Sequence, residues 1–414
     1  MQSDQTPRKG PRPLPTHLLT AALTYASSNA ALPFSKKGSL NWRIPTAKTD
    51  GLAEALATAD PILLATAVER EGRRRLSCFL DGIEAYRHHP YRRIAKEPVV
   101  VAEAGSTRLL HYPAATSEPI TSVLVVPSLV NQSYVLDLSE ESSFMRWLAA
   151  RGVEGYLVDW GRPGDLERGF DLTDYVAGRL DDLFESVRAA SDNPVFVLGY
   201  CMGGDLALAI ALRRQADVAG LAVLATPWDF HAEDEASARR LAVTAQCFEG
   251  QLTALGELST DILQLLFCML DPLLGYRKFQ SFARMDPSSA RAVDFVALED
   301  WLNDGVPLVA AVARECLGGW YGENEPARGA WHIDGKAVDP TEFRKPSIAM
   351  IPARDRIVPP TSAQALATAL PNCEVHTPQT GHIGMMAGHN AESSVWQPLE
   401  TWLRKTVGIV KFCL

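Results

Sequence analysis

Two patterns of hydrophobic residues alternate along the middle of the chain. Short runs of β-branched and other apolar residues, such as "SVLVVPS" at 122–128 and "PVFVLGY" at 194–200, are typical of strands buried on both faces. Between these runs, apolar residues recur every three to four positions, as in amphipathic helices. Strands that alternate with helices predict a mostly parallel sheet with helices on both faces. The expected strands are 108–112, 122–128, 153–161, 194–200, 218–227, 346–355 and one around Val375, and the expected helices are 141–152, 171–190, 203–215, 362–370 and 395–405.

The alternation stops at residues 228–345, where helical spacing rich in Leu, Phe, Trp and Asp takes its place. A helical insertion late in the order of a sheet is typical of a cap, or lid, over an active site. We therefore expect a core in two parts, 97–227 and 346–408, with a cap between them. Ahead of the core, the sequence predicts a flexible arm over 1–47, rich in Pro, Lys, Ser and Thr, and N-terminal helices over 48–96, with a break near Pro61.

The stretch "VLGYCMGGDLALA" at 197–209 joins an expected strand to an expected helix. It has the pattern G-x-nucleophile-x-G of a nucleophile elbow, with Cys201 at the central position. The start of the helix would favour a thiolate, and the backbone N–H of Met202 would point into an oxyanion hole. The alternative is a buried structural cysteine in a glycine-rich turn. The supporting glycines of the motif are Gly199, Gly203 and Gly204.

Partners for this cysteine follow in the chain order of α/β hydrolases, which is nucleophile, acid and histidine. Asp355 closes the expected strand at 346–355, and His382 follows the last expected strand within "TGHIGMM". Each has a structural alternative, Asp355 as a turn residue and His382 as a loop histidine, and His389 competes for the role of the base. The agreement in order and position predicts a triad of Cys201, Asp355 and His382 on an α/β-hydrolase fold.

A cysteine nucleophile suggests a particular kind of chemistry. Paired with histidine, a thiol is a better nucleophile than a hydroxyl, and its thiolate is a good leaving group. When it attacks a thioester it forms another thioester, so the acyl group stays activated and can pass to a hydroxyl. The pattern therefore favours acyl transfer from a thioester such as an acyl-CoA over simple hydrolysis.

From about residue 90 to about residue 403, the chain resembles the polyhydroxyalkanoate synthases, most of all the two-subunit, class III type. "GYCMGG" is similar to the GxCxGG box of that family and is the most specific mark. Other segments that carry the resemblance are "VPSLVNQSYVLDL" (126–138), "YLVDWGRPG" (156–164), "LTDY" (172–175), "ATPWDF" (225–230), "RDRIVPPTSAQAL" (354–366) and "GHIGMMAG" (381–388).

The resemblance implies roles for single residues. Cys201 would carry the growing chain as a thioester, and His382 would deprotonate both Cys201 and the 3-hydroxyl of the incoming monomer. Asp355 would orient His382, and the N–H of Val130 would join that of Met202 in the oxyanion hole. The substrate would be a 3-hydroxyacyl-CoA, such as 3-hydroxybutyryl-CoA, which is polymerised into polyhydroxyalkanoate with release of CoA. The resemblance implies no metal and no dissociable cofactor; it also implies a homodimer and allows for a second synthase subunit.

Three positions depart from the family pattern. Arg356 stands where family members usually carry a histidine after the aspartate, and Ser128 and Leu129 replace a proline and a tryptophan common in the longer synthases. Two other functions stay open: a cysteine-dependent hydrolase, either a thioesterase or an intracellular polyester depolymerase, and a non-catalytic granule-associated subunit. Trp320 and Trp331 of the cap either face the thiol or only pack.

Composition argues against several other classes of protein. A net charge of -9 and a pI of about 5.6, without a basic stripe, argue against nucleic-acid binding. The 7 cysteines include no CxxC pair, which argues against a zinc site or a disulfide framework. We see no signal peptide and no membrane span, because Asp271 and Pro272 interrupt the apolar run at 262–276. We therefore expect a cytoplasmic protein, which could also lie on the surface of polyester granules.

Overall fold

The computed structural model describes residues 8–32, 55–56 and 58–413. The chain divides into two compact units. The larger comprises Arg92–Leu266 and Asp304–Leu414, and the smaller comprises Met1–Tyr91 and Phe267–Asn303.

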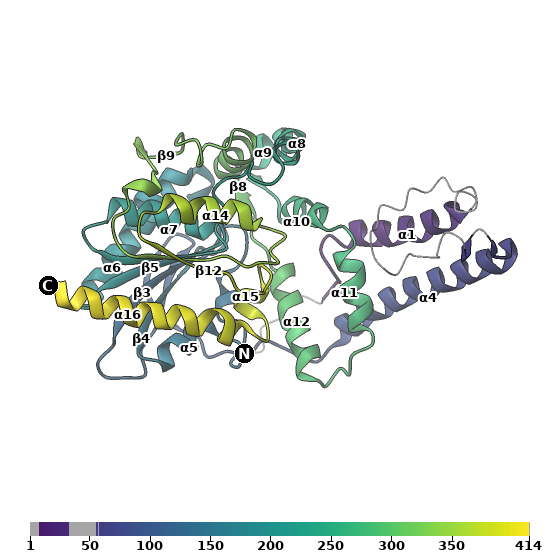
Figure 1. The fold of residues 1–414 in the computed structure, drawn as a ribbon, viewed down its shortest axis with the longest axis horizontal. Coiled ribbons are helices and arrows are strands. Elements are labelled where there is room, and N and C mark those ends of the chain that lie inside the picture. The colour runs from purple at the N-terminus through teal and green to yellow at the C-terminus, as the bar shows by residue number, and fades with distance from the viewer. Residues whose placement is uncertain (1–7, 33–54, 57, 414) are drawn as a thin grey trace. The chain divides into compact units, whose positions relative to one another are not determined.

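An eight-stranded sheet forms the centre of the larger unit, in the order β1-β2-β4-β3-β5-β6-β11-β12 (Figure 1). Strands β1 and β2, and β2 and β4, pair antiparallel, whereas every pair from β4 to β12 is parallel. This confirms the predicted, mostly parallel α/β sheet and adds β1 at its edge. The strands are β1 (Val99–Ala104), β2 (Thr107–Tyr112), β3 (Thr121–Val126), β4 (Val153–Asp159), β5 (Val195–Tyr200), β6 (Val218–Leu224), β11 (Ser347–Met350) and β12 (Cys373–His376).

Helices cover both faces of this sheet, as the sequence predicts. Helices α5 (Phe144–Ala150) and α16 (Gln397–Cys413) lie on one face, and α6 (Asp181–Ala190), α7 (Met202–Arg213) and α14 (Pro360–Ala369) lie on the other (Figure 1). All residues of β3, β5 and β6 are buried, which explains why their sequences read as continuous apolar runs.

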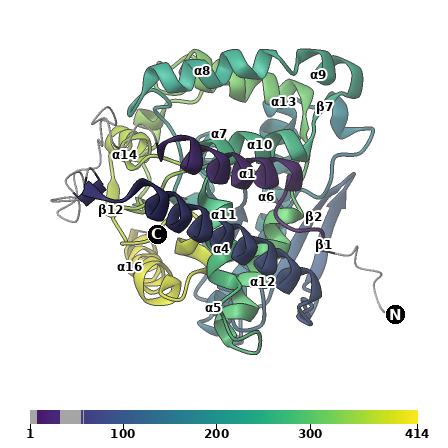
Figure 2. The ribbon, with the colours of Figure 1, turned by 90° about the vertical axis from the view of Figure 1, so that its right-hand side faces the viewer.

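The cap segment adds a third group of elements to the larger unit, and Figure 2 shows α8, α9 and α13 grouped together. The π-helix η4 packs against α8 and α13. Its Trp320 contacts Trp331 with ring centroids 5.1 Å apart and Phe230 at 5.6 Å, and both tryptophans are only 2% exposed. These tryptophans therefore pack within the cap. The elements are α8 (Glu235–Gln246), α9 (Glu249–Leu255), β7 (Glu257–Leu258), α10 (Thr260–Leu270), β8 (Leu308–Val309), α13 (Ala310–Arg314), η4 (Glu315–Gly322), β9 (His332–Ile333) and β10 (Lys336–Ala337). The last residues of α10, from Phe267 on, belong to the smaller unit.

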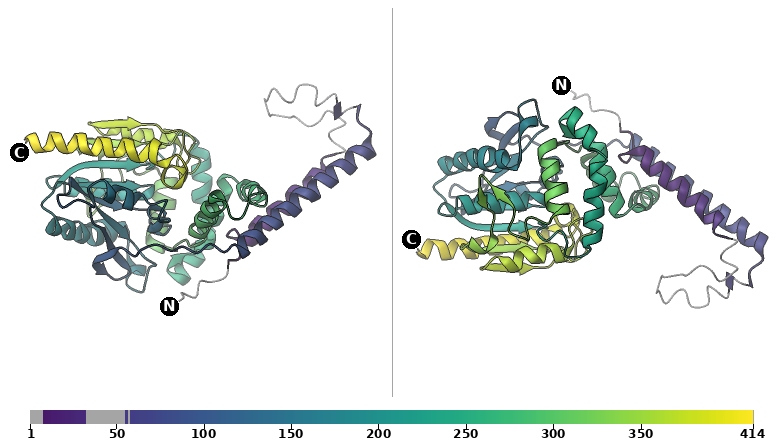
Figure 3. Two further views of the ribbon diagram at one scale, coloured as in Figure 1. Left: turned by 90° about the horizontal axis from the view of Figure 1, so that it is seen from below. Right: turned by 90° about the horizontal axis from the view of Figure 1, so that it is seen from above.

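The smaller unit is helical and has its own core. Helix α1 (Leu14–Ala30) lies along the long helix α4 (Pro61–His88), and α11 (Leu274–Phe282) packs against α4 (Figure 3). Phe79 and Tyr86 of α4 meet Phe279 of α11 edge to face. Helix α12 (Ala290–Asn303) completes this core.

Two boundaries differ from the expected organisation. The segment 1–47, expected as a flexible arm, contains α1, because its buried Ala21 and His17 pack in the smaller unit although the helix is weakly amphipathic. The expected cap at 228–345 is divided, because Phe267–Asn303 groups with the N-terminal helices. Pro61 begins α4, where the Asp60 side chain accepts hydrogen bonds from the N–H groups of Ile62 and Leu63.

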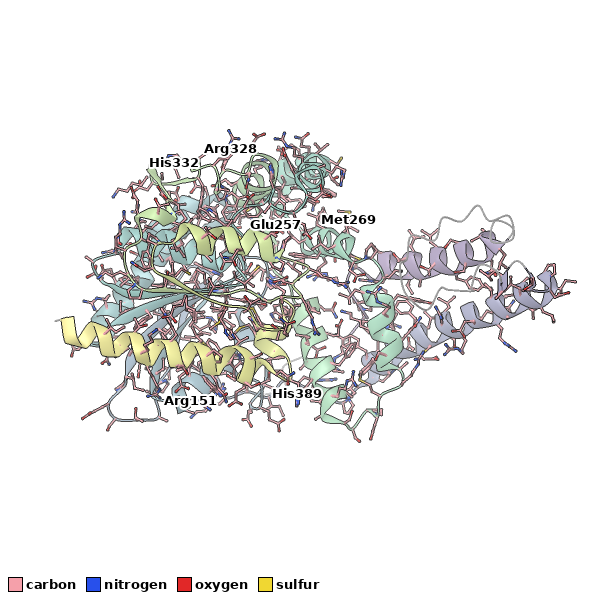
Figure 4. All side chains as sticks on the ribbon, viewed as in Figure 1. Arg151, Glu257, Met269, Arg328, His332 and His389 are labelled. Atoms are coloured by element: carbon pink, nitrogen blue, oxygen red, sulfur yellow. The ribbon has the colours of Figure 1, made fainter. Side chains whose placement is uncertain are left out.

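The apolar run at 262–276 forms α10 and the start of α11. Leu263 and Leu266 are buried, while Met269 (Figure 4) and Leu270 are about half exposed. Of the helices that the structure describes, none combines the length and the apolar composition needed to cross a lipid bilayer.

Substitution of Gly82 tests how closely α4 and α11 pack in the smaller unit. A Cβ at this position would lie 2.1 Å from the backbone oxygen of Phe279, so Gly82→Ala must push α4 and α11 apart. We expect it to destabilise the smaller unit by about 1–3 kcal/mol, measured by thermal unfolding and by amide hydrogen exchange along α4. Gly408→Ala in α16 is the control, because a Cβ there meets nothing within 4 Å. Equal exchange along α4 in the two variants would contradict the close crossing of α4 and α11.

Candidate active site

Cys201 lies between the end of β5 and the start of α7, in a strained backbone conformation. Its φ is 57° and its ψ is -135°, a region that residues with a side chain rarely adopt. Two backbone hydrogen bonds hold it there: the Cys201 N–H donates to the Leu224 oxygen at 2.9 Å, and the Gly204 N–H donates to the Cys201 oxygen at 2.8 Å. The turn therefore presents the Sγ atom where β5 ends and α7 begins, as a nucleophile elbow does.

The elbow glycines are required by close contacts with neighbouring atoms and not by their backbone conformation, since none of them has a positive φ. A Cβ on Gly199 would lie 2.3 Å from the Cα of Gly204. A Cβ on Gly203 would lie 2.1 Å from the Val126 oxygen, and one on Gly204 would lie 1.8 Å from Oγ1 of Thr226. Helix α7 therefore approaches β3 and the end of β6 more closely than any larger residue would permit.

Asp355 and His382 reach this elbow from the other half of the sheet. Asp355 follows β11, and its Oδ1 accepts hydrogen bonds from the N–H groups of Ile357 at 2.8 Å and Val358 at 2.9 Å. Its Oδ2 lies 2.7 Å from Nδ1 of His382, which follows β12. The Cys201 side chain is close enough to raise the pKa of His382, and Nε2 is the ring nitrogen that Asp355 leaves free for the thiol. The three residues that the sequence singled out are thus brought together.

Electrostatics favour a charged imidazole beside the thiol. Burial by itself lowers the pKa of His382, but the Cys201 charge, the hydrogen bonds with Asp355 and Cys201, and the Asp355 charge raise it to about 10. Both the aspartate and the histidine side chains are nearly inaccessible, so solvent screens these interactions little. The arrangement favours the imidazolium form of His382 next to Cys201.

Tyr200, directly before Cys201, is a neighbour that the sequence did not reveal. Its hydroxyl donates a hydrogen bond to the backbone oxygen of His382 at 3.1 Å. Its ring also stacks on the imidazole, with centroids 5.3 Å apart and an angle of 29° between the planes. The position before a nucleophile carries no fixed residue type in the elbow pattern, so only the fold reveals this contact.

Asp205 lies one turn after Cys201 in α7 and is completely buried. Neither carboxyl oxygen has a hydrogen-bond partner on another residue that the structure describes. Burial, and then the charge of Cys201, raise the pKa of Asp205 well above its ordinary value, while its own backbone N–H acts in the opposite direction. Asp205, beside the nucleophile, therefore keeps its proton to higher pH than an exposed aspartate does.

The expected oxyanion donors lie at the start of α7 and after β3. Met202 is the first residue of α7, so its N–H is among the amides that a helix start leaves without an intrahelical partner. Val130 is half-buried, and its N–H donates to Oγ of Ser128 at 3.3 Å. This amide therefore already has a partner on the chain, which the sequence did not indicate.

The remaining histidines lie elsewhere. His389, the competitor of His382, is exposed (Figure 4). His231, His332 and His376 each contact a backbone oxygen, of Tyr321, Ala330 and Ser394 respectively. Within the described ranges, no group of three or more His, Cys, Asp or Glu side chains could hold a metal ion.

Comparison with known proteins agrees with the fold. A family model of the alpha/beta hydrolase fold matches residues 121–388, well over half of the chain, so the protein is a member of that class. A soluble variant of monoglyceride lipase from Saccharomyces cerevisiae, solved with a substrate analog, is similar in fold, with a TM-score of 0.51 and 16% sequence identity over 77% of this chain and 98% of that chain.

Proteins of similar sequence identify the family within this class. A model of the N-terminus of poly-beta-hydroxybutyrate polymerase (PhaC) matches residues 92–148. The poly(3-hydroxyalkanoate) polymerase subunit PhaC of Synechocystis sp. is 30% identical over 68% of this chain and 77% of its own length. The PhaC subunit of Haloferax mediterranei is 27% identical over 73% of this chain, which spans only 63% of that relative. The chain belongs to the family of poly(3-hydroxyalkanoate) polymerase subunits PhaC.

Asp205 generates a prediction about pH. An aspartate in the unfolded chain releases its proton near pH 4, whereas Asp205 in the folded protein keeps it to higher pH. The folded state then binds more protons, so the free energy of unfolding falls as pH rises above 4. Asp205→Asn removes this pH-dependent contribution to the free energy of unfolding. We expect its stability relative to the wild type to rise with pH by up to about 1.4 kcal/mol per pH unit, measured by denaturant unfolding at pH 5 to 8.

Asp165→Asn is the matched control, because it makes the same change of formal charge at a side chain that is 98% exposed. A difference between Asp205→Asn and the wild type that stays constant from pH 5 to 8 would show that Asp205 is ionised in the folded protein.

Proposed function

We propose that this protein transfers hydroxyacyl groups from a CoA thioester into a polyester chain that is held on Cys201. The observation that carries the proposal is the strained cysteine at the elbow, whose side chain raises the pKa of His382, which Asp355 holds through Nδ1. Membership of the PhaC family supports the polymerase reaction. The names of the relatives point to a polymer of 3-hydroxyalkanoate units, and a CoA thioester of such a unit is the activated form that a cysteine nucleophile would accept.

In the first step, Nε2 of His382 takes the proton of the Cys201 thiol, and the thiolate attacks the carbonyl carbon of the acyl-CoA. The carbon–sulfur bond to CoA breaks, and the CoA thiolate takes the proton from His382. The product is an acyl thioester on Cys201 and free CoA. In this proposal, the N–H of Met202, at the start of α7, stabilises the oxyanion of the intermediate.

In the second step, His382 removes the proton from the 3-hydroxyl of an incoming 3-hydroxyacyl-CoA. That oxygen attacks the thioester carbonyl on Cys201, an ester bond forms, and the Cys201 thiolate leaves. The chain, now one unit longer, ends in a CoA thioester, which Cys201 attacks again to release CoA. Asp355 keeps Nδ1 of His382 protonated throughout, so Nε2 performs every proton transfer.

The thiol suits this cycle because the chain must be held in an activated form between additions. An oxygen ester on a serine would be harder for a hydroxyl to displace than a thioester, and thiolate is the better leaving group. Two features of the class III synthases, a homodimer and a second synthase subunit, belong to the same proposal, as does a location at the surface of polyester granules.

Cys201→Ala tests the reaction. Purified protein is mixed with 3-hydroxybutyryl-CoA while free CoA thiol and precipitated polyester are measured together. We expect both to form with the wild type and with Cys247→Ala, a matched control at an exposed cysteine, and to fall at least about 100-fold in Cys201→Ala. Free hydroxy acid in place of polyester would identify a hydrolase, and CoA release that survives in Cys201→Ala would overturn the mechanism.

His382 has its own test, which needs no acyl substrate. His382 is the residue proposed to take the proton of the Cys201 thiol, so its removal should slow reactions of that thiol. We expect iodoacetamide to alkylate Cys201 rapidly at pH 6, and His382→Ala to slow this about 10-fold or more. Mass spectrometry of the peptide that contains Cys201 follows the reaction, with Cys247 in the same samples as reference. Equal rates at pH 6 in the two proteins would contradict the pairing.

A further inference from the structure

Tyr200 connects the nucleophile strand to the loop that carries the base. It is the last residue of β5 and only 4% exposed. Its side chain makes two different contacts with one residue: the hydroxyl bonds to the backbone oxygen of His382, and the ring stacks on the imidazole. The first contact fixes the loop and the second fixes the plane of the ring.

Sheet order gives this connection its importance. Cys201 follows β5 and His382 follows β12, and the strands β6 and β11 lie between them. Without a direct contact, the position of His382 relative to Cys201 would depend on the accumulated placement of three strand pairs and two loops. The Tyr200 side chain contacts His382 directly, and the Tyr200 backbone is bonded to Cys201, so one residue connects the nucleophile to the base.

The hydroxyl of Tyr200 stays a hydrogen-bond donor under all ordinary conditions. Burial, and then the charges of Cys201 and Asp355, raise the pKa of this phenol well above its usual value, so it remains protonated. A buried hydroxyl that lost its acceptor would be destabilising, so the bond to the His382 oxygen holds the loop in one position.

We propose that Tyr200 is a positioning residue that holds Nε2 of His382 toward Sγ of Cys201. The inference rests on the catalytic pairing proposed above but is independent of which acyl group is transferred. In the proposed cycle His382 serves two proton donors, the thiol and then a hydroxyl, so its ring must return to the same orientation after each step. Stacking on Tyr200 restricts rotation of the ring, and the carbonyl bond restricts translation of the loop.

Displacement of a catalytic group by about 1 Å can reduce a rate about 100-fold, so loss of either contact has a measurable effect. Tyr200→Phe removes the hydrogen bond and keeps the stacked ring. Tyr200→Leu removes both. The two substitutions therefore separate the loop contact from the ring contact.

The chain offers a matched control in Tyr156 of β4, which is 2% exposed. Tyr156 stacks on His111 with centroids 4.7 Å apart and an angle of 17°, and His111 in turn contacts the carboxylate of Glu154. Tyr156→Phe thus removes a phenol hydroxyl from another buried tyrosine–histidine–carboxylate group in the same unit.

The test measures the rate of Cys201 alkylation from pH 5 to 10, together with kcat and KM for CoA release. For Tyr200→Phe we expect kcat to fall about 5- to 20-fold with little change in KM, and alkylation at pH 6 to slow about 3- to 10-fold. For Tyr200→Leu we expect larger decreases in both kcat and the alkylation rate at pH 6. Tyr156→Phe should match the wild type. A purely structural role for Tyr200 would lower the melting temperature without moving the pH dependence of alkylation.

The outcomes distinguish this inference from the proposed function. If His382→Ala slows alkylation at pH 6 but Tyr200→Phe gives the same pH profile and kcat as Tyr156→Phe, the positioning role is wrong and the pairing stands. If His382→Ala itself has no effect, the pairing fails and the positioning role fails with it. If Tyr200→Leu does not fold, Tyr200→Phe alone decides.

Discussion

Every feature of the nucleophile depends on how closely α7 approaches the sheet. The helix can begin at Met202 only because Gly203 lies against the backbone of β3 and Gly204 against Thr226. That approach forces the turn at Cys201 into a positive φ, and the bonds to Leu224 and Gly204 keep it there. Strain of this kind costs on the order of 1–3 kcal/mol and persists only where the surrounding packing determines the backbone. The buried residues of β3, β5 and β6 supply that packing, so the sheet core and the reactive thiol are parts of one arrangement.

The sequence predicted much of this arrangement because the relevant signals are local. Continuous apolar runs identify strands buried on both faces, and the spacing of glycines around Cys201 identifies an elbow, since both depend on residues adjacent in the chain. Asp355 and His382 could be chosen from chain order alone, since the ends of parallel strands meet at one edge of the sheet. The geometry brings both to Cys201.

Other features could not be predicted because they depend on contacts between distant segments. Helix α1 forms in a stretch whose composition favours disorder, and its buried Ala21 shows that tertiary packing outweighs that composition. The grouping of Phe267–Asn303 with the N-terminal helices is likewise invisible in a helical periodicity. At the site, the sequence assigns no role to Tyr200 or Asp205, because a tyrosine before the nucleophile and an aspartate after two glycines become informative only once their neighbours are known.

Together these two residues explain how a thiolate can be stabilised in a buried site that also contains acidic groups. Tyr200 and Asp205 lie on either side of Cys201 along the chain, and burial raises the pKa of both, which disfavours a negative charge on either. Asp355 has its charge balanced by two backbone N–H groups and by His382. The imidazolium is then left as the partner of the thiolate. Ionisation of Asp205 would oppose a negative charge on Cys201 directly, so the burial of this carboxyl group favours reaction at the thiol.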